Sequence, residues 1–261
     1  MNVDLSGRVA LVTGSTAGIG LATAQGLAKQ GATVWLTGRT QPRVDAALAT
    51  VAATCKNAKL HGLAADLASE AGARSVIAAV PELDVLVNNL GGVTARKPFE
   101  ELDDADWSRV LEVNLLSGAR LTRHYIGGMR RRNWGRVVFV SSESALQIPT
   151  EFPHYGVAKA AVIALARAVA ETLVGTGVTV NSVLPGPTLA EGFQRRIAAD
   201  GRSVEEFSRE FFDKFRPTSL IRRLAEPEEV ANMIVYLCTP AASATHGAAL
   251  RVDGGVVKSA F

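Results

Sequence analysis

Short apolar runs rich in β-branched residues alternate with helical stretches along the whole chain. The runs expected to form strands are residues 9–13, 33–37, 59–62, 85–88, 136–141, 178–184 and 249–252. They are apolar nearly throughout, as strands buried on both faces of a parallel sheet are. The stretches expected to form helices are 19–30, 43–54, 104–132, 155–174 and 227–237. This alternation predicts an α/β fold of the Rossmann type, a doubly wound parallel sheet of about seven strands with helices on both faces.

The length of the chain, 261 residues, suits one α/β domain, and no long polar linker or internal repeat divides it. We therefore expect a single domain over residues 1–261. Residues 188–216 interrupt the alternation with two short helical stretches. Phe207, Phe211 and Phe215 recur every four residues there and fall on one helix face. Such a stripe usually packs into a core, but an insertion after the carboxyl end of a strand is also where a substrate cover lies. We expect residues 188–216 to form such a cover.

Composition and charge argue against several classes of protein. No apolar run approaches the roughly 20 residues that cross a bilayer, and the N-terminus lacks the pattern of a signal peptide, so we expect no membrane partner and a cytoplasmic location. The two cysteines and four histidines are scattered, so no metal site is expected. The net charge is +3, and the basic run at residues 130–132 suits a helix C-terminus, because Gly135 follows it. We expect no nucleic-acid partner.

A glycine-rich turn follows the first expected strand directly. Its glycines permit a tight turn and let backbone N–H groups approach a phosphate, and the helix that opens at Gly18 adds its positive N-terminal end. The spacing is G-x-x-x-G-x-G rather than the G-x-G-x-x-G of many dinucleotide sites. Its position between a strand and a helix nevertheless predicts a pyrophosphate site. The candidate residues are Gly14, Ser15, Thr16, Gly18, Ile19 and Gly20.

The end of the second expected strand indicates which dinucleotide binds. In dinucleotide folds an acidic residue there binds the 2′-hydroxyl of NAD, whereas an arginine accommodates the 2′-phosphate of NADP. Here Arg39 occupies the position, and no carboxylate occurs before Asp45. The planar guanidinium fork suits a phosphate. The pattern favours NADP(H) over NAD(H), the alternative being that Arg39 is a solvated surface residue.

Tyr155 and Lys159 stand four residues apart, on one face of the same expected helix. Ser142 follows the strand expected before that helix. Reducing a carbonyl requires a hydride donor and a proton donor to the oxygen. A tyrosine, with a pKa of about 10 in solution, needs a neighbouring cation to act as an acid-base group at neutral pH. A serine hydroxyl can hydrogen-bond the substrate oxygen.

Taken together, these motifs resemble those of the short-chain dehydrogenase/reductase family, and the resemblance extends over residues 7–255. The residues that carry it are 13–20, Asn88, Asn89, Asn114, Ser142, Tyr155, Lys159, Pro185 and Gly186. The resemblance implies that Tyr155 is the acid-base, that Lys159 binds the nicotinamide ribose and lowers the tyrosine pKa, and that Ser142 orients the substrate oxygen.

The same resemblance implies further roles. Asn114 would hold a water that links Lys159 to a proton relay. Asp66 and Leu67 match the position that contacts the adenine. The remaining cofactor-binding positions are Asn89, beside the glycine loop, and Pro185, Gly186 and Thr188, beside the nicotinamide carboxamide.

Two residues depart from the family pattern. Leu90 replaces the usual alanine after the two asparagines, and a bulkier side chain there changes the packing against the cofactor. Ala17 stands where NADP-preferring members often carry a basic residue, which leaves Arg39 as the main sign of phosphate recognition.

The sequence therefore predicts an NADP(H)-dependent oxidoreductase that transfers a hydride between nicotinamide and a small-molecule carbonyl or secondary alcohol. The alternatives are a redox sensor that binds NADP(H) without turnover, and an isomerase or lyase on the same scaffold. The substrate is not encoded, and His154 is expected to be structural rather than a second acid-base. A homotetramer is expected, chiefly from the resemblance. The candidate substrate-pocket residues are Gly92, Val93, Glu143, Gln147, Phe152, His154 and Phe193.

Overall fold

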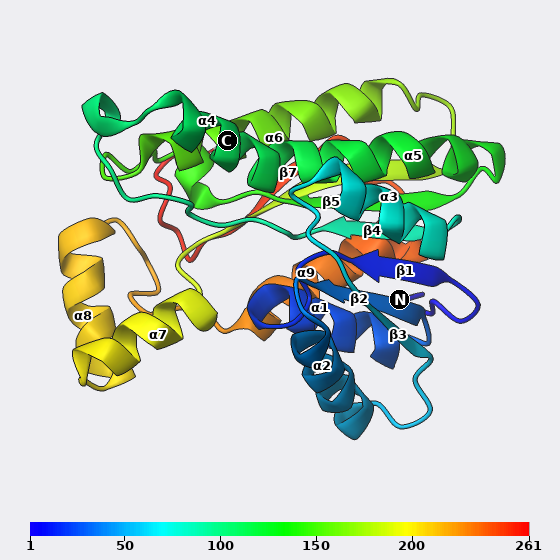
Figure 1. Cartoon of the computed structure of the whole chain (residues 1–261), viewed down its shortest axis with the longest axis horizontal. Coiled ribbons are helices and arrows are strands. Elements are labelled where there is room, and N and C mark those ends of the chain that lie inside the picture. The colour runs from blue at the N-terminus through cyan, green and yellow to red at the C-terminus, as the bar shows by residue number, and fades with distance from the viewer. Residues whose placement is uncertain (261) are drawn as a thin grey trace.

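A single seven-stranded parallel sheet forms the centre of the computed structural model, which describes residues 1–260 (Figure 1). Its strands are β1 (Val9–Val12), β2 (Thr33–Gly38), β3 (Leu60–Ala64), β4 (Val85–Asn88), β5 (Gly135–Val140), β6 (Val178–Pro185) and β7 (Ala249–Val252). Their order is β3-β2-β1-β4-β5-β6-β7, and all neighbours run parallel. The predicted doubly wound fold is confirmed. The order reverses between β1 and β4, and in such sheets ligands bind beyond the carboxyl ends of the strands at that point.

Helices cover both faces of the sheet, and a separate apolar cluster lies between the sheet and each layer of helices. One layer holds α1 (Gly18–Lys29), α2 (Gln41–Thr54) and α9 (Pro227–Cys238). The other holds α3 (Glu70–Ala79), α4 (Asp104–Leu111), α5 (Ser117–Arg131) and α6 (Pro153–Glu171). Every residue of β5 and β6 is buried, including the polar residues that interrupt their apolar runs, which are Arg136, Thr179, Asn181 and Ser182. Short 3₁₀ turns lie at η1 (Phe99–Glu101), η3 (Glu143–Ala145) and η4 (Pro240–Ala242).

The single helix predicted over residues 104–132 is interrupted. It begins at α4, where Asp103 and Asp106 form a reciprocal capping box. A π-helical turn, η2 (Glu112–Leu116), separates α4 from α5. Such turns often mark functional sites, because the extra residue re-aims the side chains around it. Asn114 lies in this turn and is buried.

The basic run closes α5, as predicted for a helix C-terminus. Arg130 and Arg131 lie in its last turn, and Arg132 pairs with Glu82 at 3.3 Å and with Asp84 at 3.8 Å. These positive side chains complement the negative end of the helix. Among residues 1–260, no helix has the length and apolar character needed to cross a membrane.

Two helices stand apart from the layers, at the left of Figure 1: α7 (Glu191–Asp200) and α8 (Val204–Phe215). They are the two short helices predicted in the insertion. Gly201, in the left-handed region with φ of 74°, ends α7, and Ser203 opens α8 in a capping box with Glu206. Their apolar side chains form a third cluster, separate from the two on the sheet. Its buried residues are Ile197, Phe207, Phe212 and Leu224.

Candidate active site

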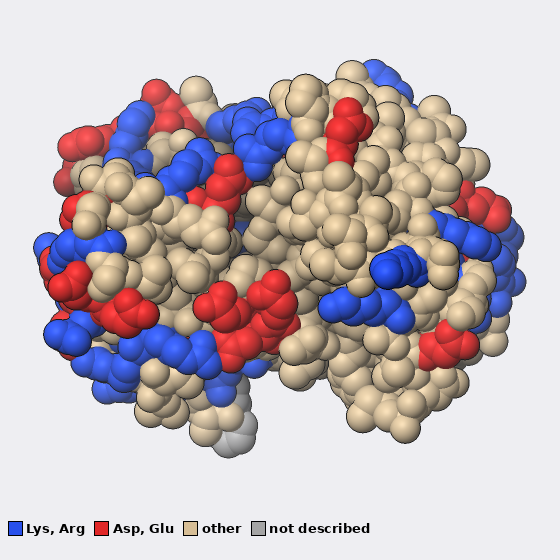
Figure 2. Space-filling view, turned by 90° about the horizontal axis from the view of Figure 1, so that it is seen from below, with Lys and Arg blue, Asp and Glu red and all other residues tan. Residues whose placement is uncertain are grey.

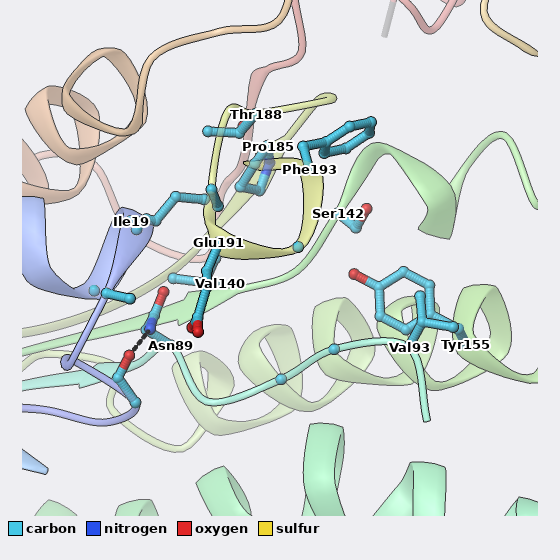
Figure 3. A pocket seen from close by; sticks show the side chains of 18 of the residues that line it. Ile19, Asn89, Val93, Val140, Ser142, Tyr155, Pro185, Thr188, Glu191 and Phe193 are labelled. Atoms are coloured by element: carbon cyan, nitrogen blue, oxygen red, sulfur yellow. Dashed lines mark hydrogen bonds between the residues drawn. The ribbon is translucent and has the colours of Figure 1, made fainter. Parts of the chain in front are cut away.

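A cleft of about 930 Å³ lies beyond the carboxyl ends of the central strands, between the sheet and α7 (Figure 3). In Figure 2 a hollow separates the charged left-hand part of the molecule, which includes α7 and α8, from the right-hand part, and positive side chains gather at its upper end. Most of the predicted site residues line this cleft. They are Gly14, Thr16, Gly18, Ile19, Gly20, Arg39, Asn89, Ser142, Tyr155, Lys159, Pro185, Gly186 and Thr188.

The glycine loop closes tightly around its neighbours. Gly14 and Gly18 have φ of 61° and 54°, a left-handed conformation that side chains disfavour. A Cβ on Gly20 would lie 2.5 Å from both Asn89 Nδ2 and Gly14 O, so only glycine fits. Ser15 is fully buried below the loop: its hydroxyl donates to Val12 O at 2.8 Å and accepts from Thr37 N at 2.9 Å. Ser15 thus fixes the loop to β2 and does not line the cleft.

The N-terminus of α1 opens into the cleft without a cap. No side chain hydrogen-bonds its first turn, and no acidic residue lies in that turn. The backbone N–H groups and the helix dipole are therefore available to an anion. Asn89 steadies the loop from the end of β4, because its Nδ2 donates to Thr13 O at 2.9 Å and to Gly14 O at 3.0 Å. A free helix N-terminus beside a glycine cradle fits the pyrophosphate of a dinucleotide.

Leu90, the residue after Asn89, also packs against the glycine loop. Its backbone N–H donates to Thr13 Oγ1 at 2.9 Å, and its side chain packs against the apolar cluster under the sheet. A Cβ on Gly14 would meet Leu90 Cα at 3.2 Å. The bulkier side chain is thus accommodated next to the glycine loop.

Arg39 lines the cleft just beyond β2, where a 2′-phosphate would be recognised. No pattern in the sequence indicated the charged residues that lie near Arg39. Arg43 binds Glu191 through two hydrogen bonds of 3.1 and 2.7 Å, and Arg195 lies 3.1 Å from the same carboxylate. These contacts hold the pKa of Glu191 below its ordinary value, with a further contribution from the charge of Arg39. Glu191 is 148 residues from Arg43 in the sequence, so no local pattern could indicate the pair.

Three other predicted residues lie outside the lining of the cleft. Leu67 is buried, and the Asp66 carboxylate accepts a hydrogen bond from the backbone N–H of Ala68 at 3.1 Å. Both follow β3, at the edge of the sheet. Asn114 lies behind the cleft: its Nδ2 donates to Gly92 O and Val110 O, both at 3.0 Å, and its Oδ1 accepts from Gly92 N at 2.9 Å.

Asn114 nevertheless approaches Lys159. A Cβ on Gly91 would lie 2.6 Å from Lys159 Nζ and 2.7 Å from Asn114 Oδ1, so both polar atoms border the same glycine. The π-helical turn thus holds the segment after β4 close to α6. The narrow space between Asn114 and Lys159 explains why residue 91 is glycine.

Ser142, Tyr155 and Lys159 meet in the cleft although they come from two elements. Ser142 follows β5, whereas Tyr155 and Lys159 lie on α6, and Figure 3 shows the hydroxyls of Ser142 and Tyr155 on one side of the cavity. Lys159 Nζ lies 5.7 Å from the Tyr155 ring centroid and donates to Val140 O at 2.9 Å. The backbone of β5 therefore fixes the ammonium next to the tyrosine.

Burial shifts the pKa values of Tyr155 and Lys159 in opposite directions. It raises the pKa of Tyr155 to about 12, with a hydrogen bond to Ser142 acting in the opposite direction and the charge of Glu143 adding to the rise. Burial lowers the pKa of Lys159 to about 8. At neutral pH the tyrosine is a neutral phenol, able to donate a proton to a substrate oxygen, and the lysine is mostly protonated beside it.

A second cavity of about 320 Å³ adjoins Ser142 and Tyr155 and suits a small substrate. Of the predicted pocket residues, Val93, Glu143, Phe152 and Phe193 line it. Gly92 lines the larger cleft instead. Gln147 and His154 line neither cavity.

Glu143 is buried in the wall of this second cavity. Its Oε1 accepts from Arg216 Nε at 3.0 Å, from Arg216 Nη2 at 2.9 Å and from the Ser144 hydroxyl at 3.2 Å, while its Oε2 has no partner within residues 1–260. Burial raises the pKa of Glu143, and Arg216 opposes the rise. The pair joins the end of α8 to the residue after Ser142.

A glycine cradle, an uncapped helix N-terminus and a serine, tyrosine and lysine in one cleft define a class of protein: a dinucleotide-dependent oxidoreductase on a Rossmann-type sheet. Comparison with known proteins gives the family. A family model described as "Enoyl-(Acyl carrier protein) reductase" matches residues 14–257. The chain belongs to the short-chain dehydrogenase/reductase family, whose enzymes act on CH–OH and C=O groups.

Individual relatives match over almost the full length. The chain is 42% identical to the uncharacterized oxidoreductase YvaG of Bacillus subtilis, over 100% of both chains. The structure of L-sorbose reductase from Gluconobacter frateurii, complexed with NADPH and L-sorbose, matches with a TM-score of 0.90 and 31% identity, over 99% of this chain and 100% of that chain. The 3-oxoacyl (acyl-carrier-protein) reductase of Agrobacterium tumefaciens with NADP bound matches with a TM-score of 0.87 and 30% identity, over 97% and 95% of the two chains.

Proposed function

We propose that the chain is an NADP(H)-dependent oxidoreductase that transfers a hydride between nicotinamide and a small-molecule carbonyl or secondary alcohol. One observation carries the proposal: Ser142, Tyr155 and Lys159 line the same cleft as the glycine loop and Arg39. Relatives solved with NADPH or NADP bound support this cofactor.

Different residues of the cleft bind different parts of the cofactor. The glycine loop and the N-terminus of α1 bind the pyrophosphate, and Arg39 binds the 2′-phosphate. Pro185, Gly186 and Thr188 flank the nicotinamide, which supplies the hydride when the cofactor is bound. This leaves the protein to position the substrate and to move a proton.

Ser142, Tyr155 and Lys159, beside the smaller cavity, carry out the proton transfer. The Ser142 hydroxyl donates a hydrogen bond to the carbonyl oxygen, and the Tyr155 hydroxyl gives its proton to that oxygen as it gains charge. The neighbouring Lys159 ammonium stabilises the phenolate that remains. In the direction of oxidation the phenolate takes the alcohol proton back.

We assign residues 188–216 as a cover over this site, within one catalytic domain. Thr188, Glu191 and Phe193 line the cofactor cleft, and Phe211 and Arg216 line the substrate cavity. The insertion therefore supplies one wall of both cavities. A wall that belongs to a separate small cluster of helices can move without disturbing the sheet.

The test is NADPH consumption with a panel of carbonyl compounds, with Tyr155→Phe compared against Tyr236→Phe, a tyrosine on α9 outside both cavities. We expect Tyr155→Phe to lower kcat at least about a hundredfold, because it removes the proton donor, and to leave the NADPH Kd unchanged. Tyr236→Phe should retain activity.

Near-parent turnover by Tyr155→Phe would contradict the assignment. Binding of NADPH without turnover of any carbonyl would favour a redox sensor, and product formation without net NADPH consumption would favour an isomerase or lyase.

A further inference from the structure

Two arginines from different segments lie where the cofactor cleft and the substrate cavity meet. Arg96 belongs to the segment that follows β4, and Arg196 belongs to α7. Each side chain lines both cavities, which the other arginines at this site do not. Their positions place two positive charges beside the space that holds the reacting end of the substrate.

Neither arginine has an anionic partner among residues 1–260: neither forms an ion pair or a hydrogen bond there. Arg195, the neighbour of Arg196, pairs instead with Glu191 at 3.1 Å. The charge of Glu151 attracts Arg96 without reaching ion-pair distance. These two guanidinium groups are therefore free to bind an anion from outside the chain.

Aromatic rings hold both guanidinium groups in place. The Arg96 guanidinium carbon lies 4.6 Å from the Phe152 ring centroid, and that of Arg196 lies 5.3 Å from Phe193 and 5.4 Å from Phe207. Burial lowers the pKa of Arg96, and the positive charge of Arg196 lowers it further, so the two cations repel each other. An anion between them would remove that repulsion.

The remaining charges of the substrate cavity leave this preference in place. Glu143 is neutralised by Arg216 through the contacts described above. Glu151 is the other carboxylate in the lining, so the cavity carries an excess of one positive charge. The rest of the wall is largely apolar, with Val93, Phe211 and Phe215 among its side chains, and suits a short hydrocarbon chain.

We propose that Arg96 and Arg196 bind a carboxylate of the substrate, so that the physiological substrate is a keto acid or the corresponding hydroxy acid. This inference rests on the proposed reductase function. Two guanidinium groups bind a carboxylate through charge-assisted hydrogen bonds, which are the strong ones in proteins. The short apolar wall then spans the distance to the carbonyl at Tyr155.

The test compares keto acids with their uncharged methyl esters in the NADPH assay: acetoacetate and levulinate against methyl acetoacetate and methyl levulinate. We expect kcat/KM to favour the acids at least about tenfold, equivalent to about 1.4 kcal/mol. Arg96→Gln and Arg196→Gln should each remove most of that preference by lowering the value for the acids alone. Arg209→Gln, which removes the same charge from the exposed surface of α8, is the matched control and should change neither.

Each other outcome has a definite meaning. Equal or better turnover of the esters by the parent, or equal losses for acids and esters in the glutamine variants, would show that no carboxylate site exists while the reductase function stands. Weaker NADPH binding in these variants, equal in size to the loss with acids, would show that the two arginines serve the cofactor instead. If neither the acids, the esters nor the neutral carbonyl panel consumed NADPH, the proposed function itself would be wrong, and the inference with it.

Discussion

Arg39 and Arg43 show how neighbouring positive residues can face different partners. Arg43 binds Glu191 through both of its terminal nitrogens, whereas Arg39 forms no ion pair or hydrogen bond within residues 1–260. A guanidinium that lines a cofactor cleft without a protein partner is available to a ligand phosphate. We therefore expect Arg39 to be the main determinant of a preference for NADP over NAD.

Arg39→Ala should weaken NADPH binding on the order of tenfold to a hundredfold, because each charge-assisted hydrogen bond contributes roughly 1.5–3 kcal/mol. The NADH Kd should hardly change, since NADH lacks the phosphate. Titration of both cofactors into the parent and the variant measures this. Equal weakening of both would mean that Arg39 supports the adenosine site structurally, and the preference for NADP would have to be abandoned.

His154 directly precedes Tyr155 but lines neither cavity. It is fully buried, both of its ring nitrogens lack partners within residues 1–260, and its ring contacts Trp107 edge-on at 6.2 Å. Burial lowers the pKa of His154, with the nearby Asp106 raising it and Lys97 lowering it. The buried environment thus favours the neutral form of His154.

This burial makes stability depend on pH. The folded-state pKa lies below the ordinary value of 6.5, so the unfolded chain takes up the proton more readily. The contribution of neutral His154 to stability is complete above about pH 6.5 and is lost progressively as the pH falls below it. Urea unfolding at about pH 8 and about pH 5 should show a smaller loss of stability in His154→Phe than in the parent. The same loss in both proteins would assign the pH dependence to other groups.

At the scale of elements, ion pairs at its two ends connect the proposed cover, α7 and α8, to the rest of the molecule. Glu191 at the start of α7 binds Arg43 of α2, with both side chains partly exposed. Arg216 at the end of α8 binds the buried Glu143. An exposed pair contributes at most about 1 kcal/mol, whereas breaking a buried pair costs several, so the α7 end should open first.

Hydrogen exchange tests this order of opening. Without cofactor, the backbone amides of α7 should exchange faster than those of α8, and Glu191→Gln should accelerate α7 further. NADPH should slow α7, because Thr188, Glu191 and Phe193 line its cleft. The backbone amides of α9, which packs on the sheet, serve as the internal control. Strong and equal protection of α7 with and without NADPH would show a fixed element rather than a cover.

The sequence could predict the elements with strong local patterns. The seven apolar runs all became strands, and the glycine loop and the Tyr155–Lys159 spacing are local signals. The helix α3 escaped prediction because it contains Gly72 and buries only Ala73 and Val76. The π-helical turn at Asn114 and the meeting of Arg96 with Arg196 have no local signal, since each depends on segments that only the fold brings together.

At the scale of the whole molecule, several apolar side chains are exposed, and two groups of them are candidates for interfaces between chains. One lies beside α6 and includes Leu146, Ile148 and Val157. The other includes Leu220, of which 82% is exposed, and Ile221, which pack against Gly255 and Gly254 of the C-terminal segment. Large contiguous apolar patches on a surface mark interfaces between protein chains, and we propose that these two groups belong to such interfaces.

Two distinct patches suit two distinct two-fold interfaces, which together generate a tetramer with mutually perpendicular axes. We therefore expect light scattering at micromolar concentration to give a mass four times the 27.5 kDa of one chain. Combining Leu220→Glu with Ile221→Glu should charge the C-terminal patch and leave dimers joined through the α6 patch. Lys258→Glu, a charge change on the same segment outside the apolar pair, is the control and should remain tetrameric. A parent mass of a single chain would contradict the assembly, and a tetrameric double variant would place the second interface elsewhere on the surface.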